Sequence, residues 1–318
     1  MTDLDRLVSH IQSGHRFLVS SHQRPDGDAI GSAVGCALAL REIGKNADVV
    51  MDGVPPHFLL PFPAVDQIRV AGTIDDAADG AIIMECSSLD RTGVSGLERS
   101  PVLNIDHHVG NTRYGAINWV DESAAACTEL VFTLIETLGI RLTPAIATHL
   151  YLGLLTDTGS FRFSNITPRS FEIARRCVEG GANPQWIAST HYDSSTLGRV
   201  RIFGQVLNTM RLDDSGRVAL LTMTTADAAA AGATYDDTEG LINFPLGVKH
   251  IQAVAFFKET GPDEWRVSMR SKGAVDVGAV ARAYGGGGHK NAAGCSARGP
   301  LSALQETFLA LLVKATAA

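Results

Sequence analysis

The feature that most limits the fold of this chain is a series of short aliphatic segments in its first half. Four of them occupy residues 17–20, 48–51, 81–84 and 102–105, and a helix is expected from about residue 29 to residue 43. Aliphatic or β-branched runs of this length, separated by helical or turn segments, are typical of buried parallel strands. The first half therefore predicts a parallel sheet in an α/β layer.

Helical spacing of apolar residues dominates the middle of the chain, from residue 124 to about residue 196. Within it, Gly180-Gly181 predicts the end of one helix and Asn183-Pro184 the start of the next. Residues 199–211 predict a further helix that connects this region to the second half.

The second half has a different pattern. Segments 217–223, 251–259 and 264–272 alternate or run apolar like strands of a second, more antiparallel sheet, and residues 301–313 predict a terminal helix. The length of 318 residues suits two domains at about 150 residues each. We therefore expect an α/β protein whose N-terminal domain has a mainly parallel sheet flanked by helices, with a smaller C-terminal α/β domain built on a mixed sheet. The expected parts are a first domain at 1–190, a linker helix at 191–210 and a second domain at 211–318.

Composition and charge argue against several classes of protein. The longest apolar run, residues 33–40, is far shorter than the ~20 residues of a membrane helix, and the N-terminus has no secretory signal pattern. Five scattered cysteines without a CxxC pair argue against a disulfide framework and fit a reducing cytoplasm. The formal net charge of -7 and the lack of a Lys/Arg run argue against binding to long duplex nucleic acid. An anionic partner should therefore be small.

Polar clusters follow three of the predicted strands, at residues 22–28, 85–91 and 106–108, and a fourth at residues 156–160 ends an apolar helix. Ligands of parallel α/β sheets bind at the carboxyl ends of the strands, so these clusters could meet at one edge. Mixed Asp and His ligation suits a divalent ion such as manganese. Two such ions about 3.5–4 Å apart can clamp a phosphoryl oxygen.

Each cluster also has a purely structural interpretation. The Pro-Asp-Gly sequence at residues 25–27 is strong turn chemistry, and Asp28 could cap the following helix. Taken alone, Glu85 is better explained as a carboxylate at a strand end, and Asp157 is equally well explained as a cap. The adjacent His107 and His108 are harder to explain structurally, and the four clusters together are far more specific than any one of them.

A further cluster lies in the second half, where four glycines at residues 285–288 precede His289 and a small-residue segment at 291–294. Consecutive glycines leave backbone amides free to approach an anion closely. The alternative is a flexible linker, although a linker does not usually carry a histidine followed by small residues. Arg270 is another candidate for anion binding, but alone it would be a surface arginine.

Together these motifs resemble the DHH phosphoesterase superfamily over nearly the whole chain. The N-terminal half carries HxxPDGDAIGS, DHH and LLTDTGSFRFSNIT, and the C-terminal half carries GGGGHxxAAG, the signature of the DHH-associated domain. The arrangement and the length are similar to the bifunctional oligoribonuclease and pAp phosphatase subfamily, also called nanoRNase. RecJ-type exonucleases are usually longer, and manganese pyrophosphatases have a different second domain.

The resemblance implies a binuclear metal site, with Mn²⁺ as the expected ion. One ion would be held by His22, Asp26 and Glu85. The other would be held by Asp28, Glu85, His107 and Asp157. Asp106 would orient His107, and His108 would lie near the scissile phosphate as a catalytic residue. The residues implied in substrate binding are Arg113, Arg270, Ser271, Gly287, Gly288 and His289.

Position 85 departs from the pattern of the superfamily, which usually has aspartate there. Glutamate keeps the charge and can still bridge two ions, but its extra methylene changes the reach by roughly 1.5 Å. The metal spacing, the occupancy and the activity therefore depend on how the site accommodates Glu85.

The predicted function is manganese-dependent hydrolysis of short oligoribonucleotides, or of linear dinucleotides such as pApA and pGpG, to mononucleotides, and of pAp to AMP. One alternative is a RecJ-like single-strand DNA exonuclease, against which the missing additional domain and the acidic net charge argue. Another is a non-catalytic nucleotide sensor in which Glu85, in place of the usual aspartate, has disabled the metal site. The expected location is the cytoplasm, without a membrane partner, and the resemblance makes a homodimer plausible.

Overall fold

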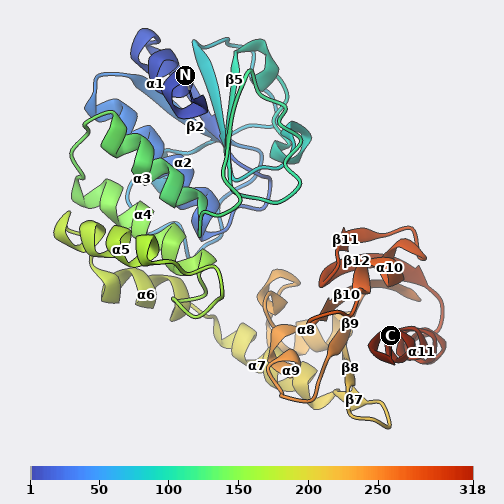
Figure 1. Cartoon of the computed structure of the whole chain (residues 1–318). Coiled ribbons are helices and arrows are strands. Elements are labelled where there is room, and N and C mark those ends of the chain that lie inside the picture. Colours follow the sequence, from blue (N-terminus) through green and yellow to red (C-terminus); the bar gives the residue numbers. More distant parts are fainter. Residues whose placement is uncertain (1, 318) are drawn as a thin grey trace. The chain divides into compact units, whose positions relative to one another are not determined.

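The computed structural model describes residues 2–317, apart from the side chains of His289 and Ala317, and it divides into two compact units. The first unit ends at Ser194 and the second begins at Ser195. Each unit has its own sheet (Figure 1). Each unit also has its own apolar cores. No helix among the described residues has the length and apolar character that crossing a bilayer requires.

The sheet of the first unit has six strands in the order β3-β2-β1-β4-β5-β6, and every neighbouring pair is parallel. The predicted parallel sheet is confirmed, although the two edge strands β3 and β6 were not foreseen. The strands are β1 (Arg16–Ser20), β2 (Asn46–Met51), β3 (Arg69–Val70), β4 (Gly80–Met84), β5 (Val102–Asp106) and β6 (Ile117–Val120).

This strand order contains one reversal of direction, which lies between β1 and β4. From β1 the chain adds β2 and β3 on one side, and it then returns to add β4, β5 and β6 on the other. Ligands of open α/β sheets bind at the carboxyl ends of the strands beside such a reversal. The segments that follow β1, β4 and β5 are therefore in the position where a site is expected.

In the described part of the chain, six α-helices belong to this unit: α1 (Asp3–Ser13), α2 (Gly27–Glu42), α3 (Cys127–Thr137), α4 (Pro144–Asp157), α5 (Pro168–Glu179) and α6 (Pro184–Tyr192). The helices α2, α3 and α4 pack against one another in the main core beside the sheet (Figure 1). As predicted, Gly180 marks the end of α5 as its C-cap, and α6 begins after Asn183, whose side chain accepts a hydrogen bond from Trp186 N. A smaller core packs strand residues such as Leu18 and Ile83 against residues outside the strands, such as Ile74 and Leu97.

The helices α2 and α4 approach each other closely because glycines lie at their contact. An ideal Cβ at Gly31 would lie 2.5 Å from the carbonyl oxygen of His149, and one at Gly27 would lie 2.5 Å from the side chain of Thr156. Residues four apart share a helix face, so these glycines open one side of α2 to α4. This contact brings Asp28, near the start of α2, toward Asp157 at the end of α4.

The second unit contains a six-stranded mixed sheet in the order β11-β12-β10-β9-β8-β7, which confirms the predicted mixed sheet. Only β8 and β9 pair in parallel; the other neighbours are antiparallel. The strands are β7 (Arg211–Leu212), β8 (Val218–Met223), β9 (Ala253–Gly261), β10 (Glu264–Ser271), β11 (Gly287–His289) and β12 (Ala292–Arg298).

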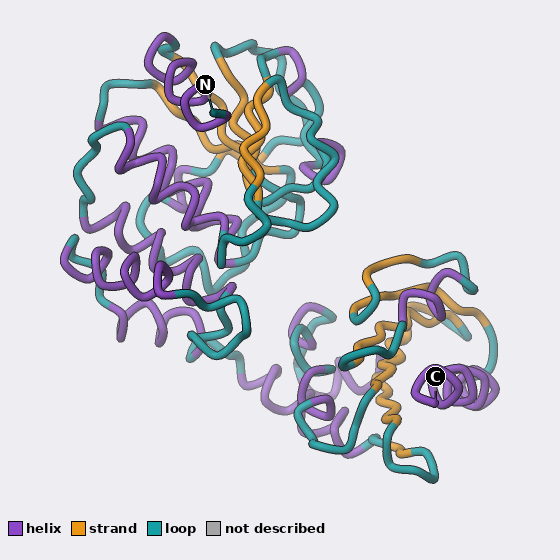
Figure 2. The backbone as a smooth tube through the Cα atoms, viewed as in Figure 1, coloured by secondary structure: helices purple, strands orange, loops and turns teal. Residues whose placement is uncertain are grey.

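Helices cover both faces of this second sheet (Figure 2). On one face α10 (Val277–Arg282) and α11 (Leu301–Ala317) enclose a core with Val267 and Phe308. On the other face α7 (Leu197–Asn208), α8 (Thr225–Ala231) and α9 (Asn243–Leu246) enclose a core with Ile202 and Phe256. The helix α7 packs against α8 and β8, so the structure places it in the second unit.

Candidate metal centre

Asp26 and Asp28 begin α2 directly after the loop that follows β1. The side chain of Asp26 caps the helix, accepting hydrogen bonds from Asp28 N at 3.1 Å and Ala29 N at 3.0 Å. The capping role considered for this motif is therefore present, but Asp26 performs it. Asp28 is buried and is free of that role.

The carboxylate of Asp28 is held by the first turn of α3. It accepts a hydrogen bond from Cys127 N at 2.6 Å and another from Thr128 N at 3.1 Å. The N-cap residue of α3, Ala126, has no side chain that could satisfy these amides. Asp28 thus supplies the missing cap from a distant segment. Burial raises the pKa of Asp28, while the two amides and the positive end of the α3 dipole act in the opposite direction.

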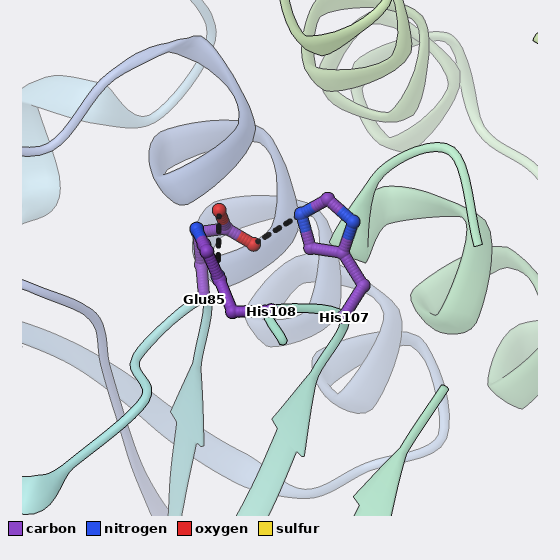
Figure 3. Close-up of side chains that lie close together, drawn as sticks. All are labelled: Glu85, His107 and His108. Atoms are coloured by element: carbon purple, nitrogen blue, oxygen red, sulfur yellow. Dashed lines mark ion pairs between the residues drawn. The ribbon is translucent and has the colours of Figure 1, made fainter. Parts of the chain in front are cut away.

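Glu85 follows β4 and points its side chain into the same cluster (Figure 3). Its backbone has a φ of 56°, a left-handed conformation that non-glycine residues seldom adopt. Its Oε2 lies 3.3 Å from Nε2 of His107, and its Oε1 lies 3.5 Å from Nδ1 of His108. Glu85 is the residue that connects the two imidazoles (Figure 3).

The ring of His107 is oriented by a backbone carbonyl. Its Nδ1 lies 3.1 Å from the oxygen of Ala124, so Nδ1 carries a proton and donates it there. Its Nε2 then faces the carboxylates, 3.5 Å from Oδ2 of Asp157 and 3.9 Å from Oδ2 of Asp28. A carbonyl on one ring nitrogen is the usual support of a metal-binding histidine.

Two groups of donor atoms are compact enough to hold an ion. In each group the ligand atoms lie within 4.8 Å of one another: Glu85, His107 and His108 form one, and Asp28, His107 and Asp157 form the other. Glu85 Oε2 and His107 Nε2 are buried atoms without a regular hydrogen bond. Because buried polar atoms normally make regular hydrogen bonds, this pair of atoms, which lie 3.3 Å apart, fits a site for a cation.

The charges of the cluster lead to the same conclusion. Burial, together with the charge of Asp28, raises the pKa of Glu85 to about 8 and that of Asp157 to about 7. Burial lowers the pKa of His107, but the Glu85 carboxylate and the other acids outweigh burial and raise it to about 10. The raised carboxyl pKa values reflect acids crowded together in a buried place, and a divalent cation would favour their ionised forms.

The structure corrects the role implied for Asp106. Its Oδ1 accepts a hydrogen bond from Nδ1 of His108 at 2.9 Å, whereas the ring of His107 is held by Ala124. Asp106 contacts His107 only through the backbone amide of that residue, at 2.8 Å. The hydrogen bond with Asp106 raises the pKa of His108, and Asp106 therefore supports the histidine expected at the phosphate.

His22 and Asp26 lie near the centre without belonging to either compact group. The charge of Asp26 tends to raise the pKa of both His22 and Asp157, so the three side chains are close enough to interact electrostatically. Burial lowers the pKa of His22, so its imidazole is neutral and available as a ligand at neutral pH. Among residues 2–317, the two compact groups include neither His22 nor Asp26.

The six residues implied in substrate binding have different environments. Arg113 is exposed on the loop after β5, and its backbone has a φ of 50°. Arg270 is half-buried and donates to the carbonyl of Met269 at 3.1 Å, while burial lowers its pKa. Ser271 is buried, and its hydroxyl donates to Val275 O and accepts from Asn291 Nδ2. The Ser271 hydroxyl is thus occupied within the protein, which argues against direct contact with substrate.

Two of the four glycines lie in a strand rather than in a flexible linker. Gly287 and Gly288 lie in the edge strand β11, which pairs with β12 opposite Gly294 and Ala293. An ideal Cβ at Gly288 would lie 2.5 Å from Ala292 O, so glycine permits close pairing of the two strands. The side chain of His289 lies outside the described part of the structure.

Sequence reasoning missed three supports of the centre. Asn111 donates to Oδ2 of Asp106 at 2.6 Å and so fixes the carboxylate that holds His108. Ala124 orients His107 through its carbonyl, and Asn165 contacts the carbonyl of Asp157. Asparagine near a motif is a weak signal, and a backbone carbonyl gives no sequence signal at all.

A parallel sheet with carboxylates and imidazoles beside its reversal point, followed by a mixed-sheet unit, defines an α/β protein of two compact units with a candidate metal centre. Each of the two units matches a known family. The DHH family, N-terminal domain, matches residues 16–154, and the DHHA1 domain matches residues 217–316. The bifunctional oligoribonuclease and PAP phosphatase NrnA of Thermus thermophilus is 35% identical over 88% of this chain and 84% of its own length.

The NrnA protein of Bacillus subtilis is 28% identical over 93% of this chain and 92% of its own. The crystal structure of an exopolyphosphatase-related protein from Bacteroides fragilis superposes with a TM-score of 0.90 at 25% identity, covering 98% of this chain and 96% of that one. Exonuclease RecJ bound to manganese shares the fold, with a TM-score of 0.53 at 13% identity over 99% of this chain and 95% of its own. The chain belongs to the DHH family of phosphoesterases, in the bifunctional oligoribonuclease and PAP phosphatase subfamily.

Proposed function

We propose that this protein hydrolyses phosphoester bonds in short oligoribonucleotides and linear dinucleotides, and removes the 3′-phosphate of pAp, with two Mn²⁺ ions. The observation that carries the proposal is the pair of buried atoms Glu85 Oε2 and His107 Nε2 at the carboxyl edge of the sheet, which lie 3.3 Å apart without a regular hydrogen bond. The printed activities of the Thermus and Bacillus relatives, oligoribonuclease and PAP phosphatase, agree with it.

The ligand assignment takes the Asp28–His107–Asp157 group for one ion, and for the other it combines Glu85 with His22 and Asp26, as the family resemblance implies. Asp28, His107 and Asp157 would hold one ion, and Glu85, with His22 and Asp26, would hold the other while bridging to the first. When bound, the ions would activate water and neutralise charge that develops on the phosphoryl oxygens. Mixed Asp, Glu and His ligation agrees with Mn²⁺, a hard-to-borderline ion.

The protein's own contribution to the chemistry centres on His108. Asp106 accepts the Nδ1 hydrogen of His108, and the raised pKa of the imidazole keeps it protonated toward neutral pH. A protonated imidazole at this place can donate a hydrogen bond to the phosphate and then a proton to the leaving oxygen. Asp106 and Asn111 would keep the ring in that orientation.

Substrate contacts outside the metal centre are assigned to both units. Arg113 is exposed and close in sequence to Asn111, which binds its backbone amide at 2.7 Å. In the second unit, Arg270 and the β11 strand with Gly287, Gly288 and His289 are the proposed contacts, with Ser271 stabilising the local backbone. We also propose a cytoplasmic location, which agrees with five free cysteines, and a homodimer.

The proposed function is tested by product analysis on a length series of 5′-labelled oligoribonucleotides, with pApA, pGpG and pAp in parallel. We expect manganese-dependent turnover of the shortest substrates, and loss of that turnover in Asp157→Ala and His107→Ala. Turnover like that of the wild type in either variant would disprove the site assignment.

Adding long single-stranded DNA as a substrate, together with measurements of pApA binding and of manganese stoichiometry, separates the alternatives. Preference for long single-stranded DNA over two-residue RNA would indicate a RecJ-like exonuclease. Tight binding of pApA without turnover, together with fewer than two bound ions, would indicate a nucleotide sensor in which Glu85 has disabled the centre.

A further inference from the structure

One short segment, residues 124–128, contacts all three members of the Asp28–His107–Asp157 group, directly or through one side chain. Ala124 O receives the Nδ1 hydrogen of His107, and the amides of Cys127 and Thr128 bind the carboxylate of Asp28. The sequence of this segment, AAACT, contains no charged residue and no metal ligand of the usual kind at these contacts. Its backbone therefore does the positioning.

Asn165 connects this segment to the third ligand. Its Nδ2 donates to Ala125 O at 2.9 Å and to Asp157 O at 3.1 Å. Asp157 is the last residue of α4, where a helix leaves carbonyls without partners inside the helix. The amide of Asn165 satisfies one of them and ties it to the residue next to Ala124.

The orientation of the Asn165 amide follows from its surroundings. Both neighbours of Nδ2 are carbonyl oxygens, which can only accept, so the nitrogen must face them. Asn165 is half-buried and its Oδ1 is buried without a hydrogen-bond partner among the described residues. An asparagine that tolerates an unsatisfied oxygen to keep two donor bonds is held there by those bonds.

We propose that Asn165 is a positioning residue for one of the two metal sites: it fixes Asp157 against the segment that holds Asp28 and His107. The proposal rests on the metal centre of the proposed function. The ion assigned to Glu85, His22 and Asp26 depends less on this connection, because these residues follow β4 and β1 and, in the described part of the chain, their side chains make no hydrogen bond to the segment 124–128. Loss of Asn165 should therefore weaken the binding of the ion held by Asp28, His107 and Asp157 more than the binding of the other ion.

The test measures manganese binding to the full-length protein, without substrate, by titration and electron paramagnetic resonance. Two variants are compared with the wild type. Asn165→Ala removes both donor bonds, and Asn165→Asp keeps the shape but places an acceptor oxygen against two carbonyls. Asn183→Ala is the matched control, because Asn183 also makes a side-chain bond to the backbone of this unit, at 3.1 Å, but far from the ligands in sequence.

We expect two ions in the wild type and in Asn183→Ala, and in both Asn165 variants one ion bound normally and the other at least ~10-fold more weakly. Circular dichroism and thermal denaturation of the metal-free proteins should show folded variants. Two ions bound within about twofold of wild-type affinity by a folded Asn165 variant would overturn the proposal, as would equal weakening of both ions. Absence of metal binding in the wild type would instead remove the proposed function itself.

Discussion

Gly153 of α4 lies directly against the carboxylate of Asp28 on α2. An ideal Cβ at position 153 would be 2.4 Å from Asp28 Oδ1 and 2.4 Å from Cγ2 of Thr128. No real Cβ occupies such space, so the position of Asp28 depends on a hydrogen atom at residue 153. The absence of a side chain at residue 153 thus determines where Asp28, a candidate metal ligand, can lie.

We therefore expect Gly153→Ala to displace Asp28 from the amides of α3. The free energy of unfolding should fall by roughly 1–3 kcal/mol, as for other overpacked cores, and manganese affinity should fall with it. Chemical denaturation of the metal-free protein and manganese titration measure the two effects.

Gly204→Ala is the control, since Gly204 is an exposed interior residue of α7 with nothing within 4 Å of its ideal Cβ. It should stabilise the protein by about 0.5–1 kcal/mol through helix propensity. If the two substitutions had the same sign, crowding at Gly153 could not be the cause.

Glu85→Asp should retain manganese binding and activity. The carboxylate stays within the same charged cluster, and ions can adjust to a reach that is shorter by roughly 1.5 Å. The measurement is manganese stoichiometry together with turnover of pApA. Complete loss of metal in this variant would contradict the tolerance that we infer for position 85.

His108→Gln should lower kcat by about 10²–10⁴-fold while both ions remain bound, because glutamine removes the proton donor. Its readouts are steady-state kinetics on pApA and manganese stoichiometry. His108 also belongs to one compact group of possible ligands, so the stoichiometry decides between two roles. Loss of one ion in His108→Gln would mean that His108 is a ligand.

Asp106→Asn should move the alkaline limb of the kcat profile to lower pH. The hydrogen bond to the Asp106 carboxylate raises the pKa of His108, and neutral asparagine removes that cause. A proton donor loses activity as the pH rises through its pKa, so a lower pKa shortens the active range on the alkaline side. An unchanged alkaline limb would show that His108 does not control it.

His149 should make the protein less stable in acid, independently of the metal centre. It is fully buried in α4, and burial lowers its pKa to about 4 despite the bond between Nε2 and Pro63 O. The neutral form stabilises the fold above the unfolded pKa of about 6.5, and this contribution is lost as the pH falls toward 4. The shift corresponds to about 3 kcal/mol.

Urea denaturation of the metal-free wild type and of His149→Asn from pH 7 to pH 4 tests this prediction. The difference in unfolding free energy between the two proteins should shrink as the pH falls, because only the wild type must accommodate a buried imidazolium. A constant difference would contradict it.

Most of the first sheet was predictable because its signals are local. The segments 17–20, 48–51, 81–84 and 102–105 all lie in strands, since apolar runs of this length must be buried on both faces of a parallel sheet. The short edge strand β3 was missed because its residues are exposed, and β11 because glycine has little strand preference of its own. Their pairing depends on neighbours that are remote in sequence.

The sequence by itself determined which residue types could form a metal centre and at which strand ends they stand, since motif and periodicity are properties of neighbouring residues. Only the tertiary structure decided how these residues are held. In the folded chain Asp106 accepts a hydrogen bond from the ring of His108, and the carbonyl of Ala124 accepts one from the ring of His107. The carboxylate of Asp28 caps α3. Every residue carries a backbone carbonyl, and every residue except proline carries a backbone N–H. The sequence therefore cannot show which of these groups will contact a ligand residue, because that depends on the folded structure.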